Sequence, residues 1–322
     1  MNIGKCFGAW CRQAALSAAL VACAAPGWAQ NYPNRPIRIV VPLPAGSTVD
    51  VLARAMAQGM DAKLNQRLVV DNRTGAGLVL GMDAVAAAPA DGYTLAFTPA
   101  TPLTIQLHRG KTHTYAADSF IPVCQTFENI FFLAVGPKSP YQDIKALLAD
   151  LKGNPGKLRY GHSGIASSPH LMAAELWKDM GLKVTDVPYR GETAFAPDLL
   201  TGELDAGMAT THLISTQKLR PLLAFAKERS KFFPDVPTTA ELGFPILASG
   251  YGGLFVRAGT SAAALLALES ACREVVASTP YKNLADSMFQ NVTYLNRQAF
   301  AARLAEDFQA KARLLSILRL PD

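Results

Sequence analysis

Residues 40–54 read Val-Val-Pro-Leu-Pro-Ala-Gly-Ser-Thr-Val-Asp-Val-Leu-Ala-Arg and join a predicted buried strand to a predicted helix through a loop of small residues. The β-branched run at 37–41 that leads into it predicts a short strand, which the two prolines terminate. A helix is predicted over residues 51–64, with Thr48 or Asp50 as its cap. Free N–H groups and the positive end of the helix dipole then face the loop. Such a unit can hold an anion, although most βα turns bind nothing.

The same alternation of strand and helix continues along the chain. Strands are predicted at 66–72 and 93–98, with a helix of small residues through Ala88 between them. Three βα units in succession predict an α/β fold with a mainly parallel sheet covered by helices. Gly75, Gly77 and Gly81 do not have dinucleotide-site spacing and follow the second strand instead of the first. No nucleotide cofactor is therefore predicted.

The middle and the end of the chain predict a second lobe and a return to the first. An extended apolar segment at 120–135 precedes helices at 141–152, from 168 and at 193–201, with strands at 158–160, 183–188 and 204–209. Another extended run at 249–256 precedes only helices, at 261–277, 280–289 and 297–317. Helices without strands need a sheet to cover, so we expect residues 30–126 and 251–322 to form domain 1 and residues 127–250 to be an inserted domain 2. Two such lobes enclose a ligand cleft.

The first 29 residues have the pattern of a secretory signal peptide. Lys5 and Arg12 give a basic start, residues 14–25 are apolar and uncharged, and Gly27-Trp28-Ala29 is a small-x-small cleavage site. The apolar run is shorter than the roughly 20 residues that span a bilayer. We therefore predict export to the periplasm with cleavage after Ala29. An alternative is a lipoprotein box ending at Cys23, which would leave the mature chain lipidated.

Charge and cysteine usage exclude several classes of function. Processing lowers Lys plus Arg from 31 to 29 against 25 acidic residues, and the remaining basic residues are scattered, so nucleic-acid binding is not expected. Cys124 and Cys272 survive processing, and two unpaired buried thiols are expected unless their Cα atoms approach within about 7 Å. The five histidines show no ligand spacing shared with a cysteine or carboxylate, so no metal site is predicted.

Ligands of open parallel sheets bind beyond the carboxyl ends of the strands, and this rule selects the candidate site. The selected loops are rich in Gly, Ala, Ser and Thr and nearly free of fixed charge, which suits a carboxylate or another anion bound by N–H groups and hydroxyls. The predicted ligand-binding residues are Pro44, Ala45, Gly46, Ser47, Thr48, Asp50, Thr98, Ala100, Thr101, His162, Ser163, Ala166, Ser167, Ser168, Tyr189 and Thr210.

A hydrolase is the enzymatic alternative, because residues 161–164 read Gly-His-Ser-Gly. A nucleophile elbow needs Gly-x-Ser-x-Gly, and residue 165 is isoleucine. His170 has no acid fixed beside it in the sequence, and Asp205 is expected at the amino end of its strand, away from the cleft. We therefore predict a binding protein without catalytic activity.

Nine segments of the mature chain keep the order and spacing of a known family, and they are residues 32–38, 40–54, 71–77, 91–95, 154–158, 163–170, 187–191, 198–202 and 233–238. On these segments the chain resembles the Bug family, the extracytoplasmic solute-binding proteins of tripartite tricarboxylate transporters. The resemblance implies a two-lobe periplasmic-binding-protein fold, capture of a small carboxylate by two facing loops, and delivery to membrane permease subunits by a monomeric receptor. An input subunit of a signalling system, with a sensor protein as partner, is an alternative.

The chain departs from the family pattern at three positions that bear on ligand choice. Val49 stands within Gly46-Ser47-Thr48-Val49-Asp50, where the family has Gly-Gly-Ser-Thr-Asp. His162 replaces a small hydroxyl residue, and Ala209 replaces an aspartate that the family commonly has. Loss of a carboxylate in the cleft disfavours a ligand ammonium group, so we expect a plain or aromatic carboxylate instead of an amino acid.

Overall fold

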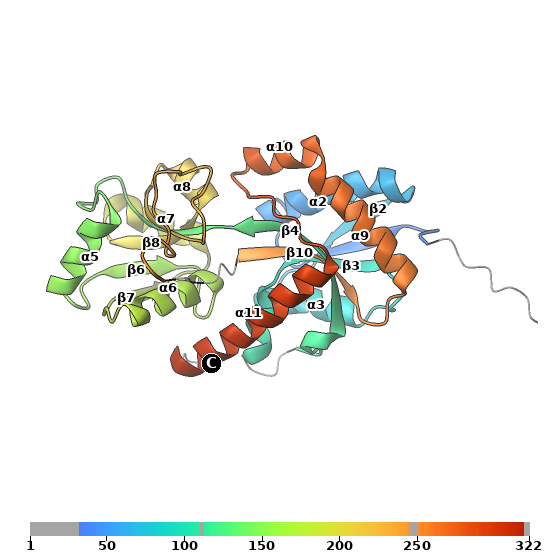
Figure 1. Cartoon of the computed structure of the whole chain (residues 1–322), viewed down its shortest axis with the longest axis horizontal. Helices are drawn as coiled ribbons and strands as arrows, with labels where there is room; N and C mark the ends of the chain where they lie inside the picture. Colours follow the sequence, from blue (N-terminus) through green and yellow to red (C-terminus); the bar gives the residue numbers. More distant parts are fainter. Residues whose placement is uncertain (1–31, 110–112, 245, 247–249, 319–322) are drawn as a thin grey trace, which may run out of the picture.

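The computed structural model describes residues 32–109, 113–244, 246 and 250–318, and they form two α/β lobes side by side (Figure 1). The predicted signal peptide and Cys23 lie outside the described residues. Within the described part of the chain, no helix combines the length and the apolar character needed to cross a membrane.

Lobe 1 is built on a five-stranded mixed sheet with the strand order β2-β1-β3-β10-β4. Strands β1, β2 and β3 are mutually parallel, as predicted, whereas β10 runs antiparallel to both of its neighbours. The chain thus returns to the first sheet through β10. The strands are β1 Ile37–Val41, β2 Leu68–Asn72, β3 Thr94–Pro99, β4 Phe120–Asn129 and β10 Gly250–Arg257.

Lobe 2 repeats this plan with the strand order β7-β6-β8-β5-β9. Strands β6, β7 and β8 are parallel, and β5 is antiparallel to β8 and β9. Strand β9 was not predicted, because no glycine or proline turn separates its apolar run from the preceding helix. The strands are β5 Phe131–Val135, β6 Arg159–His162, β7 Thr185–Pro188, β8 Ala206–Thr210 and β9 Arg220–Phe225.

Helices cover both faces of each sheet. In lobe 1, α2 Thr48–Leu64, α9 Ala262–Ala277 and α10 Thr279–Ser287 pack on one face, and α3 Val79–Ala86, α4 Thr101–Thr104 and α11 Arg297–Leu318 lie on the other. In lobe 2, α5 Ile144–Gly153 and α6 Ser168–Asp179 lie opposite α7 Glu192–Thr201 and α8 Thr211–Gln217. The three short 3-10 turns are η1 Ala76–Leu78, η2 Gln106–His108 and η3 Ala117–Ser119.

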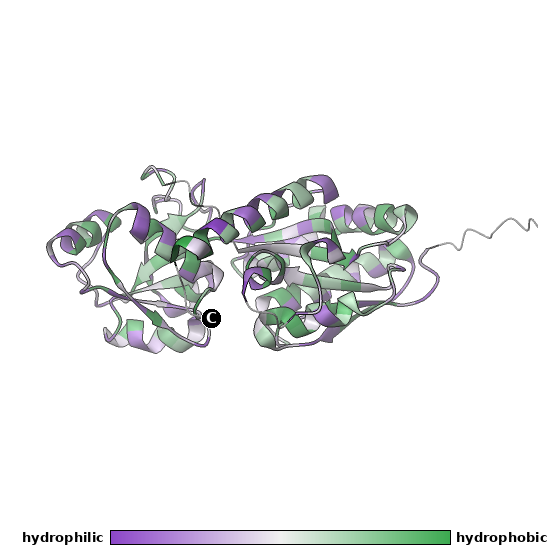
Figure 2. Ribbon diagram, turned by 90° about the horizontal axis from the view of Figure 1, so that it is seen from below, coloured by the Kyte–Doolittle hydropathy of each residue, from purple (hydrophilic) through white to green (hydrophobic). Residues whose placement is uncertain are grey.

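Alternation along the strands explains these layers. Ile37 and Ile39 face the core under α2 and α9, whereas Val40, the residue after Ile39, faces the core under α3 and α11. All three side chains are buried, as expected of strands covered on both faces. Figure 2 shows the two lobes again side by side, and the C-terminal end of α11 packs against lobe 2 at Ala166 and Leu171.

The two cysteines meet the distance condition for a bridge, so the expectation of two unpaired thiols does not hold. Cys124 of β4 and Cys272 of α9 form a disulfide, with their Cα atoms 6.7 Å apart. The two residues are 148 positions apart in sequence, and only the return of the chain to sheet 1 brings them together. The bridge ties a C-terminal helix to the sheet, so it joins the two segments that make up lobe 1.

The register of the crossing strands fixes which sheet edges face each other. In lobe 1, Asn129 at the end of β4 pairs with Gly250 at the start of β10. Two residues farther along β10, Gly252 pairs with Pro99, the last residue of β3. The carboxyl ends of β3 and its parallel neighbour β1 therefore lie at the edge where the chain leaves for lobe 2.

The same argument holds on the other side of the crossing. The chain enters lobe 2 after Ile130, and Phe131 at the start of β5 pairs with Thr210, the last residue of β8. Strands β6 and β7 are parallel to β8, so their carboxyl ends lie at this edge as well. The loops that the sequence rule selected in the two lobes thus face each other. The predicted domain bounds at 127 and 250 stay predictions.

Candidate functional site

The lobe 1 half of the site is the turn between β1 and α2. A hydrogen bond from Ser47 N to Pro44 O, 3.2 Å long, closes the turn, and Gly46 adopts a positive φ of 82° there. Ser47 caps α2, since its Oγ accepts from Asp50 N at 3.3 Å. The predicted caps, Thr48 and Asp50, are wrong by one and three positions because the helix begins earlier than its apolar pattern.

The buried side chain of Asp50 holds this turn in place by hydrogen bonds. Its side chain is 1% exposed and accepts hydrogen bonds from Gly46 N at 2.8 Å and from Asn72 Nδ2 at 2.8 Å. Arg54 Nε and Nη2 each lie 3.0 Å from the carboxylate. Burial alone would raise the pKa of Asp50, but these donors lower it on balance. All of these contacts are within lobe 1, so the carboxylate shapes the loop as a permanent anion.

Other predicted residues of lobe 1 are divided between core and surface. Thr98 and Ala100 are buried, and Ala100 N donates to Tyr251 O at 2.8 Å. Pro44, Ala45 and Gly46 are exposed, and Thr48 and Thr101 are half-buried. Val49 packs in the core with α9, so its substitution does not place an apolar group in the cleft.

The lobe 2 half is the turn from β6 into α6. Ser167 caps the helix, with Oγ accepting from His170 N at 3.4 Å. Gly164 and Ala166 both have positive φ, 115° and 55°. The left-handed conformation is unfavourable for alanine, so outside contacts must hold Ala166 in place. Ser163 and Ser167 are half-buried, whereas Ala166 and Ser168 are buried.

Two histidines hold this turn. The rings of His162 and His170 stack with centroids 4.1 Å apart and planes 7° apart. His162 Nδ1 lies 2.9 Å from Gly164 O, and His170 Nδ1 accepts from Ala166 N at 2.9 Å. His162 is thus buried beneath the loop, and its side chain is not at the loop surface.

Asp186 of β7 completes a cluster that the sequence did not reveal. Its Oδ2 lies 3.2 Å from His162 Nε2 and 3.8 Å from His170 Nε2. The metal prediction was based on spacing along the chain, and the fold brings together three potential ligand atoms that lie within 4.8 Å of one another. The parallel strands β6 and β7 set this cluster, because they place Asp186 opposite Tyr160, two residues from His162.

Direct contacts join the two halves of the site. Thr101 Oγ1, after β3, lies 3.4 Å from Ser168 Oγ at the start of α6. Arg109 Nη1 donates to Ile165 O at 3.3 Å. Ile105 of lobe 1 packs with Ala166, Leu171 and the end of α11. The loops selected from each lobe therefore meet, as the strand register requires.

The remaining predicted residues of lobe 2 bond to acidic partners. Tyr189 Oη donates to Asp198 at 2.5 Å. Thr210 donates from both N and Oγ1 to the Glu192 carboxylate, each at 2.8 Å. Burial raises the pKa of Glu192, and the two Thr210 bonds oppose that rise.

Glu192 corrects the reasoning from Ala209. Its carboxyl group accepts two hydrogen bonds from Thr210, the residue next to Ala209, so an acidic side chain stands where the sequence suggested a lost one. The sequence contained a signal for this, since an acid directly follows Gly191 at the carboxyl end of a strand. Asp186 gave no comparable signal, because an acid within an exposed edge strand is ordinary. Asp205 lies where expected, at the amino end of β8 beside Arg159.

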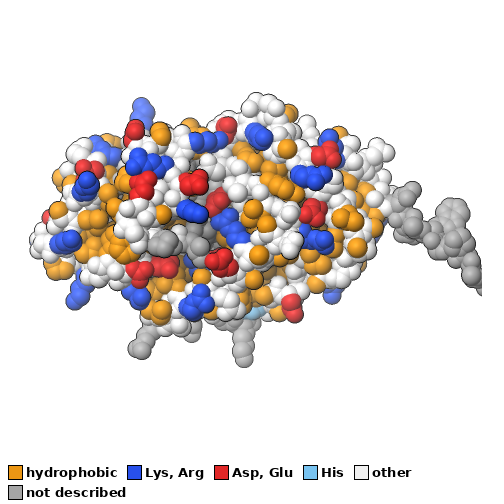
Figure 3. All heavy atoms as spheres, in the orientation of Figure 1, with side chains coloured by type: hydrophobic (Ala, Val, Ile, Leu, Met, Phe, Trp, Pro, Cys, Tyr) orange, Lys and Arg blue, Asp and Glu red, His pale blue; other side chains and the backbone are white. Residues whose placement is uncertain are grey.

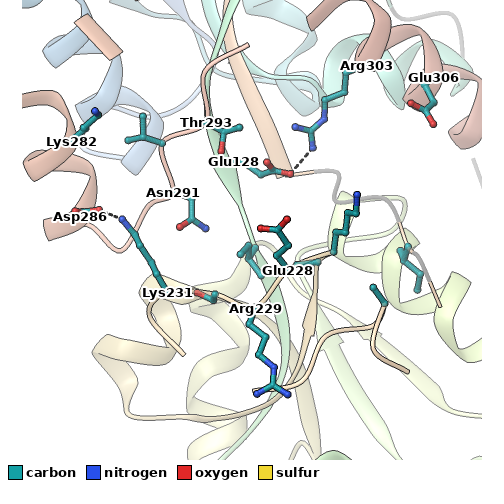
Figure 4. A pocket seen from close by; sticks show the side chains of 17 residues that line it. Glu128, Glu228, Arg229, Lys231, Lys282, Asp286, Asn291, Thr293, Arg303 and Glu306 are labelled. Carbon is teal, nitrogen blue, oxygen red and sulfur yellow. Dashed lines mark hydrogen bonds and ion pairs between the residues drawn. The ribbon is translucent and has the colours of Figure 1, made fainter. Parts of the chain in front are cut away.

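A cavity of about 860 Å³ lies elsewhere between the lobes and includes none of the predicted site residues. It is formed by the segment after β9, by α10 and by α11, and Figure 4 shows Lys231 directed toward Asp286 and Arg303 toward Glu128. Five basic and four acidic side chains line it. Charges of both signs are also mixed over the molecular face shown in Figure 3. Neither the cavity nor this face therefore has an excess of positive charge that would attract an anion.

Comparison with known proteins identifies the family. The model of the tripartite tricarboxylate transporter family receptor matches residues 52–320. The chain belongs to this receptor family. The resemblance to Bug proteins is thereby confirmed, and the receptor is a solute-binding protein with two lobes.

Named relatives cover most of this receptor. Protein BugT of Bordetella pertussis is 34% identical over 262 residues, which are 79% of this chain and 80% of BugT. A TctC solute-binding protein from Polaromonas is 30% identical, with a TM-score of 0.78 over 88% of this chain and 99% of that one.

Two structures from Rhodopseudomonas palustris share the receptor's fold at 23% identity. One was determined with adipate and has a TM-score of 0.77 over 90% of this chain and 99% of that one. The other, MatC, has malate bound and a TM-score of 0.73 over 88% of this chain and all of that one.

Proposed function

We propose that this receptor captures a small carboxylate between the 44–48 and 163–168 loops and presents it to membrane permease subunits from the periplasm. The observation that carries the proposal is the 3.4 Å contact between Thr101 Oγ1 and Ser168 Oγ, which joins the two lobes at the helix N-termini. Hydroxyls and free helical N–H groups suit a carboxylate. The malate and adipate found in structures of the same fold support this ligand class.

The binding residues are proposed from the same geometry. Ser47 and Ser167 begin α2 and α6 at the facing edges, so the positive ends of two helix dipoles point toward one region. Thr101 and Ser163 add hydroxyls from each lobe. The acidic side chains already present, Asp50 and Glu192, are satisfied by their own partners and leave these groups to the ligand.

Calorimetry with malate, adipate and aspartate tests the proposal. We expect at least one dicarboxylate to bind and to raise the melting temperature without being converted. Ser163→Ala and Ser167→Ala should each weaken binding by about 1 kcal/mol, roughly fivefold, because each removes a hydrogen-bonding group. Thr201→Val is the matched control, since Thr201 lies at the far end of α7.

Three results would contradict the proposal. Unchanged affinity in both serine variants would remove the lobe 2 loop from the site. Tight binding of aspartate without malate or adipate would show that the ligand is an amino acid. Product formation from the ligand would identify an enzyme instead of a receptor.

A further inference from the structure

The stacked pair His162–His170 lies directly under the proposed carboxylate loop. Their side chains are 0% and 5% exposed, whereas Asp186 beside them is 48% exposed. Between them the two rings contact the backbone of Gly164 and Ala166, the two residues of the loop with positive φ. The pair is therefore placed to control the shape of the loop without touching the ligand.

The contact with Ala166 fixes the protonation of His170. Its Nδ1 accepts the Ala166 N–H at 2.9 Å, so this nitrogen must keep its lone pair and the ring proton is on Nε2, toward Asp186. A second proton would break the bond that holds Ala166 at a φ of 55°. Burial lowers the pKa of His170 to about 4, followed by repulsion from His162, which agrees with a neutral ring.

His162 has the opposite arrangement. Its Nδ1 lies 2.9 Å from Gly164 O, and its Nε2 lies 3.2 Å from Asp186 Oδ2, so both ring nitrogens face acceptors. A neutral ring has only one N–H, so at one of these two contacts a lone pair of the ring faces a lone pair of the acceptor. If Nδ1 is the unprotonated nitrogen, it can instead accept from Gly164 N at 3.3 Å. A doubly protonated ring satisfies both acceptors.

Three neighbouring side chains surround the His162–His170 pair and affect how readily it takes up a proton. Asp186 faces it from β7, Arg109 from the segment after η2, and the neutral Tyr160 ring lies 5.8 Å from the His162 ring. Burial lowers the pKa of His162, and the bonds to Asp186 and Gly164 oppose this. A proton added to the pair is therefore better accommodated on His162, with acceptors at both ring nitrogens, than on His170.

A metal ion fits the same atoms poorly. Imidazole binds metals along the lone pair, which lies in the plane of the ring. Two rings stacked 4.1 Å apart with planes 7° apart have lone pairs that do not converge on one point. Shared binding would need one ring to turn, and His170 would lose its bond to Ala166.

We propose that His162 and His170 are positioning residues of the carboxylate loop and that ligand binding is coupled to protonation of His162. The inference rests on the proposed carboxylate-binding function. A positive His162 under the loop attracts a bound carboxylate, and by linkage the carboxylate favours the protonated ring. Affinity then rises as pH falls toward the pKa of His162, over the range in which the ligand stays ionised.

Side-chain ¹⁵N NMR between pH 5 and 8.5, without ligand and with saturating malate or adipate, tests the coupling. We expect His170 to remain neutral with its proton on Nε2, and the pKa of His162 to rise by about half a unit with ligand. That rise corresponds to about threefold tighter binding of the carboxylate to the protonated form. An unchanged pKa of His162, or a His170 ring protonated on Nδ1, would overturn the proposal.

His162→Asn separates positioning from simple structural support, because the amide can still donate to Gly164 O but does not titrate. The affinity of wild-type protein should increase as pH falls from 8 to 6, approaching about threefold only below the pKa of His162, while that of the variant should stay constant. His108→Asn is the matched control, since the ring of His108 bonds to Phe308 O on α11 and not to the loop backbone. The same pH profile in His162→Asn and wild type would contradict the assignment.

The backbone amide signals of Gly164 and Ala166 make the inference testable apart from any ligand. In ligand-free protein these signals should titrate with His162 and become pH-independent in His162→Asn. If neither malate nor adipate binds the wild-type protein but the amide signals still titrate, the proposed function is rejected and the positioning role stays supported. Signals that do not titrate would reject this inference whatever the protein binds.

Discussion

The loops at 44–48 and 163–168 are matching halves of one proposed site, but the two lobes hold them by different chemistry. In lobe 1 a buried carboxylate, Asp50, fixes Gly46 with the help of Arg54 and Asn72. In lobe 2 two stacked imidazoles fix Gly164 and Ala166. A carboxylate with a lowered pKa keeps its charge as pH falls from neutral, whereas an imidazole gains a proton on the acid side of neutral. The comparison indicates that the anchor of the lobe 1 loop keeps a fixed charge, whereas the anchor of the lobe 2 loop responds to protonation.

The lobes also differ in covalent support, and the largest expected effect tests this. Reduction of Cys124–Cys272, or replacement of both by alanine, should lower the free energy of unfolding of lobe 1 by about 5 kcal/mol, because the closed loop spans 148 residues. Hydrogen exchange followed separately in the two lobes measures it. Equal loss of protection in both lobes would show that they unfold as one unit.

Removal of the lobe 1 anchor should have the next largest effect. Asp50→Ala deletes a buried acceptor of three groups and should cost about 3 kcal/mol in urea unfolding, since hydrogen bonds to a buried charge are stronger than neutral ones. Glu274→Ala, which removes an exposed ion pair with Lys63, is the control and should leave the midpoint nearly unchanged. Similar midpoints for both variants would mean that Asp50 is not an anchor.

The contribution of the lobe 2 anchor, His170, to the free energy of unfolding should depend on pH. A lowered pKa of His170 means that the folded state binds fewer protons than the unfolded one, so stability falls as pH drops below about 6.5 toward the folded pKa of about 4. Between pH 7 and pH 5 this loss should be about 2 kcal/mol. His170→Asn keeps an acceptor for Ala166 N and does not titrate, so it should lose correspondingly less. A parallel pH profile in wild type and variant would contradict the comparison.

Removal of the helix cap should have the smallest effect on stability and nearly the same effect in both lobes. Ser47→Ala and Ser167→Ala each remove a cap and should each lower stability by about 1 kcal/mol at pH 7, measured by urea unfolding. Because the caps are equivalent, this pair is the internal standard for the comparison. A difference of more than about 1 kcal/mol between them would show that the loops differ in more than their anchors.

Sequence patterns were most reliable where one short segment contains its own physical signal. The run at 37–41, with its alternating apolar side chains and following prolines, predicted β1 at its observed bounds. Cap positions were less predictable, since Ser47, Thr48 and Asp50 are all good caps and only the backbone conformation selects Ser47. Strand β9 had no local turn signal and was missed.

The sequence by itself determined the family, the two α/β series and the loops rich in hydroxyls and glycine, because these depend on periodicity and on motifs within a few residues. Tertiary structure decided the anchors. The Cys124–Cys272 bridge, the His162–His170–Asp186 cluster and the Glu192–Thr210 bonds all join residues whose proximity depends on strand order. Spacing along a chain predicts contacts within a helix or a turn, whereas contacts across a sheet are set by which strands become neighbours.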